Sequence, residues 1–281
     1  MRARSFIAFA LLLLYACAAT APQREGVPPA HRRFVALVPS LAEDLFAIGA
    51  GGRVVGVSQF TGIAPQSVAR VADFESVDTE KIVALHPDAV VAIPAQERFI
   101  EPLRRAGIRV DIIRDDTFDD IFGAIRRLGR LSGRDDAARE KVAQLRAQTY
   151  RLRTRAMSFR RRPRVFFVLG TGPLWTVGST SYLGQLVKLA GGADAAAIQQ
   201  PWGQYSEEAL VHADPDAIVA GPQVRLRDVL GREPWRSLRA VREGHVFLIG
   251  DERVANALYR PGPGYNEGLR WLIERLTPLA R

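Results

Sequence analysis

Short, continuous apolar runs alternate along the chain with longer segments in which apolar residues recur three or four positions apart. The apolar runs, which predict buried β-strands, are 34–38, 54–57, 89–92, 110–113, 165–169, 217–220 and 246–249. The segments with helical spacing are 42–48, 99–106, 118–131, 182–190 and 265–276. Strands that alternate with helices in this way indicate an α/β fold with mainly parallel sheets.

One part of this pattern occurs twice. Residues 79–92 align with residues 207–220 without a gap, at an offset of 128 positions. The residues of the first copy that recur in the second are Glu80, Val83, Pro87, Asp88, Ala89, Val91 and Ala92. Each copy predicts a short helix, a Pro-Asp turn and a buried strand, with Asp78 or Thr79 as the N-cap of the first helix and Ser206 as that of the second. The repeat therefore predicts two halves of similar construction.

A long helix is predicted between the two copies. Residues 135–159 contain neither glycine nor proline, which predicts one helix of about 25 residues. We place a first Rossmann-like lobe at 34–134, an interlobe helix at 135–162 and a second such lobe at 163–281. The arginines at 160–162 are expected at a solvated helix end, with phosphate binding as the alternative. A helical connection predicts a rigid joint between the lobes.

The N-terminus has the features of an export signal. Residues 1–19 have a positively charged start, an apolar centre and small residues after it, and 20–33 are predicted to form a flexible tether. Cys17, the only cysteine of the chain, ends a segment similar to a bacterial lipoprotein box, in which the cysteine is lipidated. Cleavage after Ala19 or Ala21 is the alternative. Either interpretation places the mature protein outside the cytoplasmic membrane, and the first anchors it there through Cys17.

The charge does not point to a nucleic-acid partner. The 281 residues include 39 basic and 30 acidic ones, a net charge of +9, and only Lys81, Lys141 and Lys188 are lysines. This arginine bias, beside abundant alanine and glycine, indicates a compositional preference. We therefore expect no nucleic acid among the partners.

Residues suited to catalysis or metal binding are sparse. The histidines, His31, His86, His212 and His245, are too few and too scattered to predict a metal site. The sequence has no GxGxxG pattern after a strand, no phosphate-binding GxxxxGK[ST] and no GxSxG nucleophile elbow. We therefore expect a protein that is not an enzyme and needs no cofactor.

Several motifs, in this order, resemble a known family. They are Val38-Pro39-Ser40 before a helix, Val55-Gly56-Val57-Ser58, the segment 80–88, and Arg260-Pro261-Gly262-Pro263. From about residue 34 onward the chain is similar to the periplasmic solute-binding proteins of ABC importers for cobalamin, iron–siderophore complexes or haem, above all to the cobalamin-binding group. The resemblance implies two lobes joined by one long helix, the class III periplasmic-binding-protein fold. It also implies a monomer that holds a small metal-chelate ligand in its cleft and delivers it to a dimeric permease. A corrinoid is the expected ligand, and a ferric siderophore or haem is the alternative.

The resemblance further implies which residues contact the ligand. They are Phe60, Phe74, Trp175, Trp202, Tyr205, Asp251, Arg253, Tyr259 and Arg260. The two tryptophans stand beside proline and glycine, which favours loops facing the cleft, whereas core packing is the alternative for every aromatic residue. Asp251 and the residues up to Arg260 are assigned to the loop after the strand at 246–249. Arg260 is expected to pair with an anionic ligand group or to brace the turn before the last helix. If haem is the ligand, Tyr205 and Tyr259 are the candidates for its ligation.

The repeat and the resemblance together assign a second surface. Glu80 and Glu208 occupy equivalent positions of the two copies, and the resemblance implies that they meet arginines of the two permease subunits. Two equivalent acidic surfaces suit a dimeric partner. The alternative is that both carboxylates only complement a helix dipole. Glu207 could take the place of Glu208.

Overall fold

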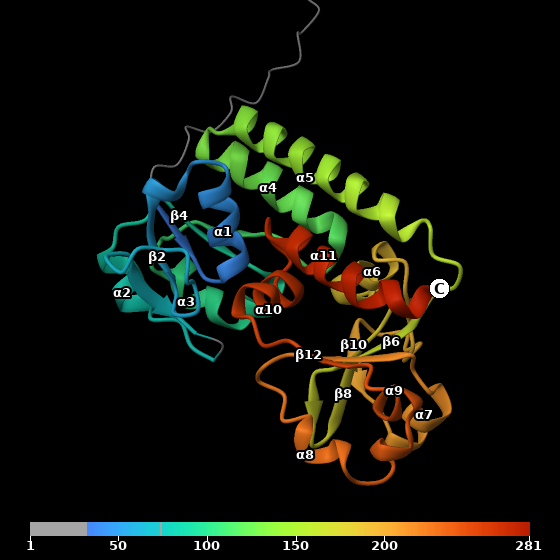
Figure 1. The fold of residues 1–281 in the computed structure, drawn as a ribbon. Helices are drawn as coiled ribbons and strands as arrows, with labels where there is room; N and C mark the ends of the chain where they lie inside the picture. Colours follow the sequence, from blue (N-terminus) through green and yellow to red (C-terminus); the bar gives the residue numbers. More distant parts are fainter. Residues whose placement is uncertain (1–32, 74) are drawn as a thin grey trace, which may run out of the picture.

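The computed structural model describes residues 33–73 and 75–281, so Cys17 and Phe74 lie outside the described residues. The first lobe is built on a five-stranded sheet with the order β3-β2-β1-β4-β5, in which every pair is parallel (Figure 1). Its strands are β1 (Phe34–Ala36), β2 (Val54–Ser58), β3 (Ala69–Ala72), β4 (Ala89–Ala92) and β5 (Val110–Ile112). The β1 and β4 side chains are fully buried, as expected for strands covered on both faces.

The second lobe contains two sheets. A parallel sheet has the order β12-β11-β6-β9, and a small antiparallel sheet has the order β10-β8-β7. The parallel strands are β6 (Arg164–Val168), β9 (Ala193–Asp194), β11 (Ala217–Ala220) and β12 (Val246–Leu248). The antiparallel strands are β7 (Gly170–Thr171), β8 (Leu174–Val177) and β10 (Trp202–Gln204). The predicted α/β class with mainly parallel sheets is confirmed, and the small antiparallel sheet is an addition to it.

Helices cover the sheets and fill the space between the lobes. The α-helices are α1 (Pro39–Ala47), α2 (Thr79–Ala84), α3 (Ile100–Arg105), α4 (Phe118–Ser132), α5 (Asp135–Ala156), α6 (Tyr182–Leu189), α7 (Glu207–Ala213), α8 (Arg227–Leu230), α9 (Arg239–Arg242), α10 (Glu252–Tyr259) and α11 (Tyr265–Leu276). Short 3₁₀ helices lie at Gly51–Arg53, Pro94–Phe99, Trp235–Ser237 and Thr277–Ala280. α11 has the predicted bounds, and α5 ends three residues before the predicted end at residue 159.

The two copies of the sequence repeat have the same backbone. Each helix begins after a side-chain cap: Asp78 accepts a hydrogen bond from the Lys81 N–H, and Ser206 accepts one from the Ala209 N–H. Each copy has a left-handed residue before its proline, His86 with φ 44° and Asp214 with φ 34°. The left-handed residue reverses the chain, so that the helix runs directly into the following strand, β4 or β11.

The aspartate of each Pro-Asp turn holds the start of the neighbouring central strand. Asp88 Oδ2 accepts a hydrogen bond from the Arg33 N–H at 2.9 Å, and Asp216 Oδ2 accepts one from the Arg164 N–H at 2.7 Å. Burial raises the pKa of Asp216, but this bond and the guanidinium groups of Arg161 and Arg239 outweigh burial, so the net pKa is lowered. The repeated aspartates are therefore structural residues.

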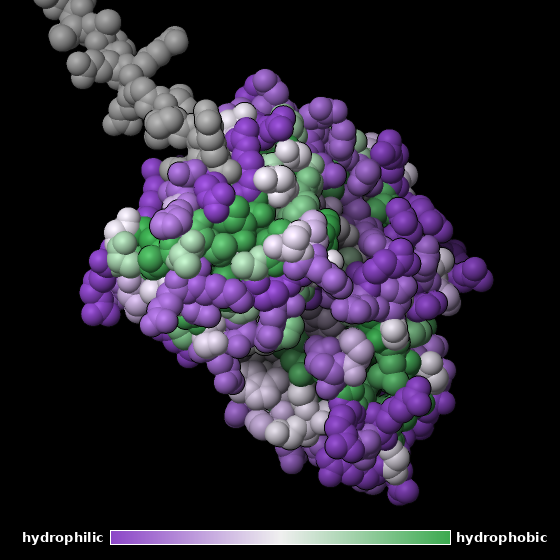
Figure 2. Space-filling model, turned by 90° about the vertical axis from the view of Figure 1, so that its left-hand side faces the viewer, coloured by the Kyte–Doolittle hydropathy of each residue, from purple (hydrophilic) through white to green (hydrophobic). Residues whose placement is uncertain are grey.

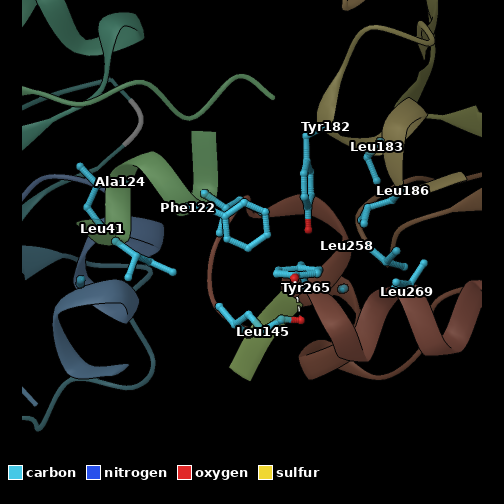
Figure 3. Close-up of a cluster of buried hydrophobic side chains, with 14 of the residues drawn as sticks. Leu41, Phe122, Ala124, Leu145, Tyr182, Leu183, Leu186, Leu258, Tyr265 and Leu269 are labelled. Carbon is cyan, nitrogen blue, oxygen red and sulfur yellow. Dashed lines mark hydrogen bonds between the residues drawn. The ribbon is translucent and has the colours of Figure 1, made fainter. Parts of the chain in front are cut away.

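One hydrophobic core extends through both lobes. Residues from β1, α1, α4 and α5 belong to the same buried cluster as residues from β6, α6, α10 and α11. Figure 3 shows Phe122 of α4, Tyr182 of α6 and Tyr265 of α11 meeting at its centre. The Tyr265 hydroxyl donates to the Leu145 carbonyl at 3.2 Å, and the Tyr182 hydroxyl donates to the Ala257 carbonyl at 2.8 Å. The lobes thus meet through packed side chains as well as through α5, and the boundaries at 134 and 163 remain a prediction.

Candidate ligand-binding site

A cavity of about 790 Å³ lies between α1 of the first lobe and the α10–α11 region of the second. Phe46, Ile63 and Ala257 contribute apolar surface to its lining, and Glu43 and Arg260 contribute charge. The lining segments follow the carboxyl ends of β1, β2 and β12, which is where open α/β sheets bind ligands. Its position between the lobes makes it the candidate site.

An ion pair crosses this cavity from one lobe to the other. The Arg260 guanidinium lies 3.2 Å from the Glu43 carboxylate, and the two side chains are only 22% and 21% exposed. Burial raises the pKa of Glu43, and the charge and hydrogen bond of Arg260 oppose that rise. Arg260 therefore braces the two lobes, and an anionic ligand group would compete with Glu43 for it.

Two more carboxyl groups, those of Asp44 and Asp115, belong to the same charged cluster as Glu43. The Asp44 side chain is fully buried, and neither of its oxygens has a hydrogen-bond partner among the described residues. Burial raises the pKa of Asp44 strongly, Glu43 and Asp115 raise it further, and Lys141 lowers it. Burial also raises the pKa of Asp115 to about 7, and Ser40 provides a hydrogen bond that favours its charged form. Asp44 and Asp115 are therefore acidic groups that are hard to ionise, although neither lines the cavity itself.

The segment after β12 is a helix, which corrects the expected loop. α10 begins after Asp251, whose carboxylate accepts a hydrogen bond from the Arg253 N–H at 2.8 Å and thereby has a lowered pKa. Val254, Ala255 and Leu258 are buried on one side of α10, which packs on α11. This apolar spacing drives helix formation. Arg253 lines the cavity and pairs with Asp251 at 3.3 Å and with Glu267 at 3.8 Å.

Trp175 and Trp202 lie side by side, on strands and not in loops as expected. Trp175 is on β8, Trp202 is on β10, and their ring centroids are 5.7 Å apart with 40° between the planes. The antiparallel register pairs Trp175 with Gln204, so Trp202 is its diagonal neighbour on the same face. Trp202 is 63% exposed. The pair presents a broad aromatic surface to solvent.

The two tyrosines pack toward the core of the second lobe. The Tyr205 ring lies 5.3 Å from that of Phe166, and the Tyr259 ring lies 6.4 Å from that of Phe167. The Tyr259 hydroxyl is buried beside Gly221 without a well-formed hydrogen bond, and burial raises its pKa. Contact of either hydroxyl with a ligand remains a prediction.

The loop after β2 contributes to the cavity through a residue that sequence reasoning missed. Phe60 is partly exposed, and its N–H donates to the Ser58 hydroxyl at 3.2 Å. Ile63, three residues further on, is 55% exposed and lines the cavity. An isolated isoleucine in a polar loop between Gly62 and Pro65 was the available signal.

The acidic residues of the repeat occupy equivalent places. Glu80 and Glu208 are the second residues of α2 and α7, both are exposed, and neither has an ion pair or side-chain hydrogen bond within the described residues. Each helix enters its strand through a tight turn, so it runs antiparallel to that strand and begins near the carboxyl edge of the sheet. Glu207 differs, because its carboxylate accepts a hydrogen bond from Trp235 Nε1 at 2.7 Å. Glu207 is therefore held inside the second lobe, which leaves Glu208 available.

Two kinds of feature were also sought over 33–73 and 75–281. No group of three or more His, Cys, Asp or Glu side chains in these ranges is arranged to hold a metal ion. No helix there combines the length and the apolar character needed to cross a membrane. Of the residues predicted to contact the ligand, Arg253 and Arg260 line the cavity, whereas Trp175 and Trp202 form a separate aromatic surface.

Sequence comparisons match most of the chain. The model of the periplasmic binding protein family matches residues 35–252. A Bacillus subtilis protein named as an uncharacterized ABC transporter substrate-binding lipoprotein, YvrC, is 28% identical over 257 residues, which cover 88% of this chain and 80% of that protein. A cobalamin-binding protein of Halobacterium salinarum is 33% identical over 243 residues, which cover 82% of this chain and 65% of that protein.

Solved structures show the same architecture. The periplasmic vitamin B12 binding protein BtuF of Vibrio cholerae superposes with a TM-score of 0.74 and 26% identity, over 88% of this chain and 97% of that one. Periplasmic haem-binding proteins share the fold at TM-scores of 0.75 to 0.78, with identities under 25%. The two-lobed fold expected from the sequence is therefore confirmed, and the relatives are transport proteins rather than enzymes.

Proposed function

The chain belongs to the periplasmic binding protein family, whose members deliver small molecules to ABC importers, and on that premise we propose that its ligand is a corrinoid. The protein acts outside the cytoplasmic membrane, in a group of relatives that bind vitamin B12, haem or iron compounds. Lipid anchoring through Cys17 is part of the proposal, and the lipoprotein name of the Bacillus subtilis relative supports it.

The tryptophan pair is the observation that carries the proposal. A corrinoid is large and flat, and burial of its macrocycle against aromatic rings supplies most of the affinity at about 25 cal/mol per Å², before the cost of association. Trp175 and Trp202 offer such a surface on one face of the antiparallel sheet. The names of the Halobacterium salinarum and Vibrio cholerae relatives support the same ligand.

A titration with three ligands tests the choice. We expect cyanocobalamin to quench tryptophan fluorescence and to release heat with one-to-one stoichiometry, whereas a ferric hydroxamate and haemin should do neither. Trp202→Ala should weaken cyanocobalamin binding by about 2 kcal/mol, or about thirtyfold, because an exposed aromatic contact is lost. Tyr150→Ala is the matched control, since Tyr150 is 74% exposed on α5, and it should bind like the native protein.

Two results would contradict these expectations. Tight binding of haemin or of the ferric hydroxamate, without binding of cyanocobalamin, would assign the ligand to the alternative class. Equal affinity of Trp202→Ala and the native protein would remove the tryptophan pair from the site.

We also propose that Glu80 and Glu208 dock the loaded protein on a dimeric permease. Their equivalent positions in α2 and α7, their exposure and their lack of internal partners support this role. Two carboxylates related by the internal repeat match a partner whose two subunits present the same surface. The hydrogen bond from Trp235 explains why Glu207 is the weaker candidate.

A further inference from the structure

α5 and the segment that follows it carry a concentration of positive charge that the cleft does not use. Between residues 142 and 164 the chain has eight arginines and no aspartate or glutamate, and all eight arginines are exposed. Arg161 pairs with Asp216 at 3.0 Å, and the Arg146 guanidinium lies 4.8 Å from the centre of the Phe122 ring. The other six form no ion pair with any carboxylate in the described part of the chain.

The dipole of α5 accounts for only part of this charge. Arg153 and Arg155 lie in the last turn, where a cation is favourable. Arg151 lies earlier, and the arginines at 160–162 lie beyond the helix, where the dipole no longer acts. Like charges in one region repel one another, so this part of the surface attracts anions.

Exposed apolar side chains alternate with the arginines along one line of the helix. Arg146, Tyr150, Arg153 and Met157 follow one another at spacings of four, three and four residues, which places them on one face of α5. Tyr150 is 74% exposed and Met157 is 77% exposed. A tyrosine and a methionine between arginines form the combination by which a helix lies on a lipid headgroup layer.

The placement of α5 leaves this line open to a flat surface. Its inner side packs on α4 and α11, and α5 runs along the outer edge of the molecule in Figure 1. α2 and α7, which carry Glu80 and Glu208, lie on the two lobes away from that edge. Contact through α5 therefore leaves the interlobe cavity and the acidic residues free.

We propose that the Arg146–Tyr150–Arg153–Met157 face of α5 binds the surface of a membrane that contains anionic phospholipids. Periplasmic and lipoprotein relatives act beside a membrane, so such a surface is within reach of the protein. This contact holds the free protein with its cleft turned away from the lipid, so that the cleft can take up ligand. Docking on a permease then requires α5 to be released from the lipid surface. The inference rests on the extracytoplasmic location and does not depend on which ligand is carried.

Vesicle binding of the full chain tests the proposal. Sedimentation with phosphatidylcholine vesicles, with and without phosphatidylglycerol, should show binding that needs the anionic lipid and falls as salt rises. Replacing Arg146 and Arg153, the two arginines of this face, by glutamine should weaken this binding about twenty-five-fold, since each arginine near such a surface contributes about fivefold. The matched control replaces the exposed, unpaired Arg104 and Arg227 by glutamine, with the same loss of charge, and should change binding by no more than about threefold.

A fluorescent label reports the contact directly. In a Cys17→Ser background, a probe at Met157→Cys should shift to the blue with anionic vesicles, whereas one at Val83→Cys on α2 should not. Equal loss in both arginine pairs, or a shift only at Val83, would overturn the proposal. So would binding to soluble heparin without binding to anionic vesicles, because that outcome identifies a polyanion site instead.

Discussion

Among individual residues, Asp44 and Asp115 stand out because they are acidic and yet enclosed beside the candidate site. Asp44 has no hydrogen-bond partner in the described chain, and Asp115 has a pKa raised to about 7 by burial. A carboxyl group that is kept from water favours its neutral form, so the folded protein takes up protons here that the unfolded chain would release. These groups lower stability at neutral pH.

Substitution of Asp115 makes this cost measurable. Because the pKa of Asp115 is raised from 3.8 to about 7, the folded protein binds this proton more tightly than the unfolded chain does. The stabilisation that the bound proton gives the folded state is complete below about pH 4 and is lost as the pH rises through 7. Asp115→Asn should remove up to about 4 kcal/mol of this decline in the free energy of unfolding. Urea denaturation at a series of pH values measures it. The exposed Glu274→Gln is the control, and an unchanged pH profile in Asp115→Asn would show that Asp115 ionises freely in the folded state.

The sequence repeat identified an acidic residue in each copy as a candidate for docking, but it could not decide between two adjacent glutamates in the second copy. Glu207 and Glu208 are adjacent and chemically alike, and only the packing of Trp235 against the α7 segment separates them. The ligand role of Arg260 was left with two alternatives for a similar reason, since its partner Glu43 is 217 positions away in sequence. Long-range pairs of this kind are not visible in local patterns.

At the scale of elements, the sequence predicted those helices and strands whose ends are determined by residues within or next to them. The caps, the Pro-Asp turns and the buried runs of the repeat predicted α2–β4 and α7–β11, because each of these features acts within a few residues. The bounds of α11 follow from an apolar stripe, since seven of its twelve residues, from Tyr265 to Leu276, are buried on one side.

The elements that were missed depend on distant partners or short stretches. β8 and β10 are four and three residues long, and they pair across a segment that contains α6. The glycine and proline beside each tryptophan indicated loops, but sheet pairing overrode them. α10 was hidden because its burial against α11 was needed to reveal its apolar side.

The pairing of α2 with α7 leads to a prediction about transport. Glu80→Arg together with Glu208→Arg should abolish uptake of the ligand, because both docking contacts become repulsive, while the affinity for cyanocobalamin stays within about twofold of the native value. Cellular uptake of labelled cobalamin and calorimetry of the purified protein measure the two effects separately. Glu140→Arg together with Glu274→Arg changes the charge equally on exposed helix faces and should transport normally. Normal uptake by the Glu80/Glu208 variant would refute the docking role.

At the scale of the whole molecule, the joint between the lobes is a shared core rather than a hinge. The side chains around Tyr265 come from helices of both lobes. Figure 2 looks onto the side of the molecule that faces left in Figure 1, and it shows apolar side chains on the surface of the upper and the lower part. A large change in lobe angle would have to break this packing, which protein interiors resist. The long helix alone predicted rigidity, whereas the core that reinforces it could not be read from the sequence.

Small-angle scattering of the free and ligand-loaded protein tests this rigidity. We expect the same radius of gyration in both states within experimental error, because Tyr265, Tyr182 and Phe122 hold the helices together. Tyr265→Ala should loosen the joint and cost about 3 kcal/mol of stability. A clear compaction of the native protein on binding cyanocobalamin would show that the lobes close by a hinge motion.

The hydrogen bonds of Arg33 affect how the first lobe resists a pulling force. Its N–H bonds to Asp88, and its guanidinium donates to the Leu85 carbonyl at 2.7 Å, directly before β1. β1 is the middle strand of its sheet, with β2 and β4 on either side. Tension applied to the chain ahead of Arg33 would therefore load two rows of hydrogen bonds in shear, instead of peeling a border strand one bond at a time. A protein attached to a membrane through this end would therefore resist unfolding when a force pulls on the attachment.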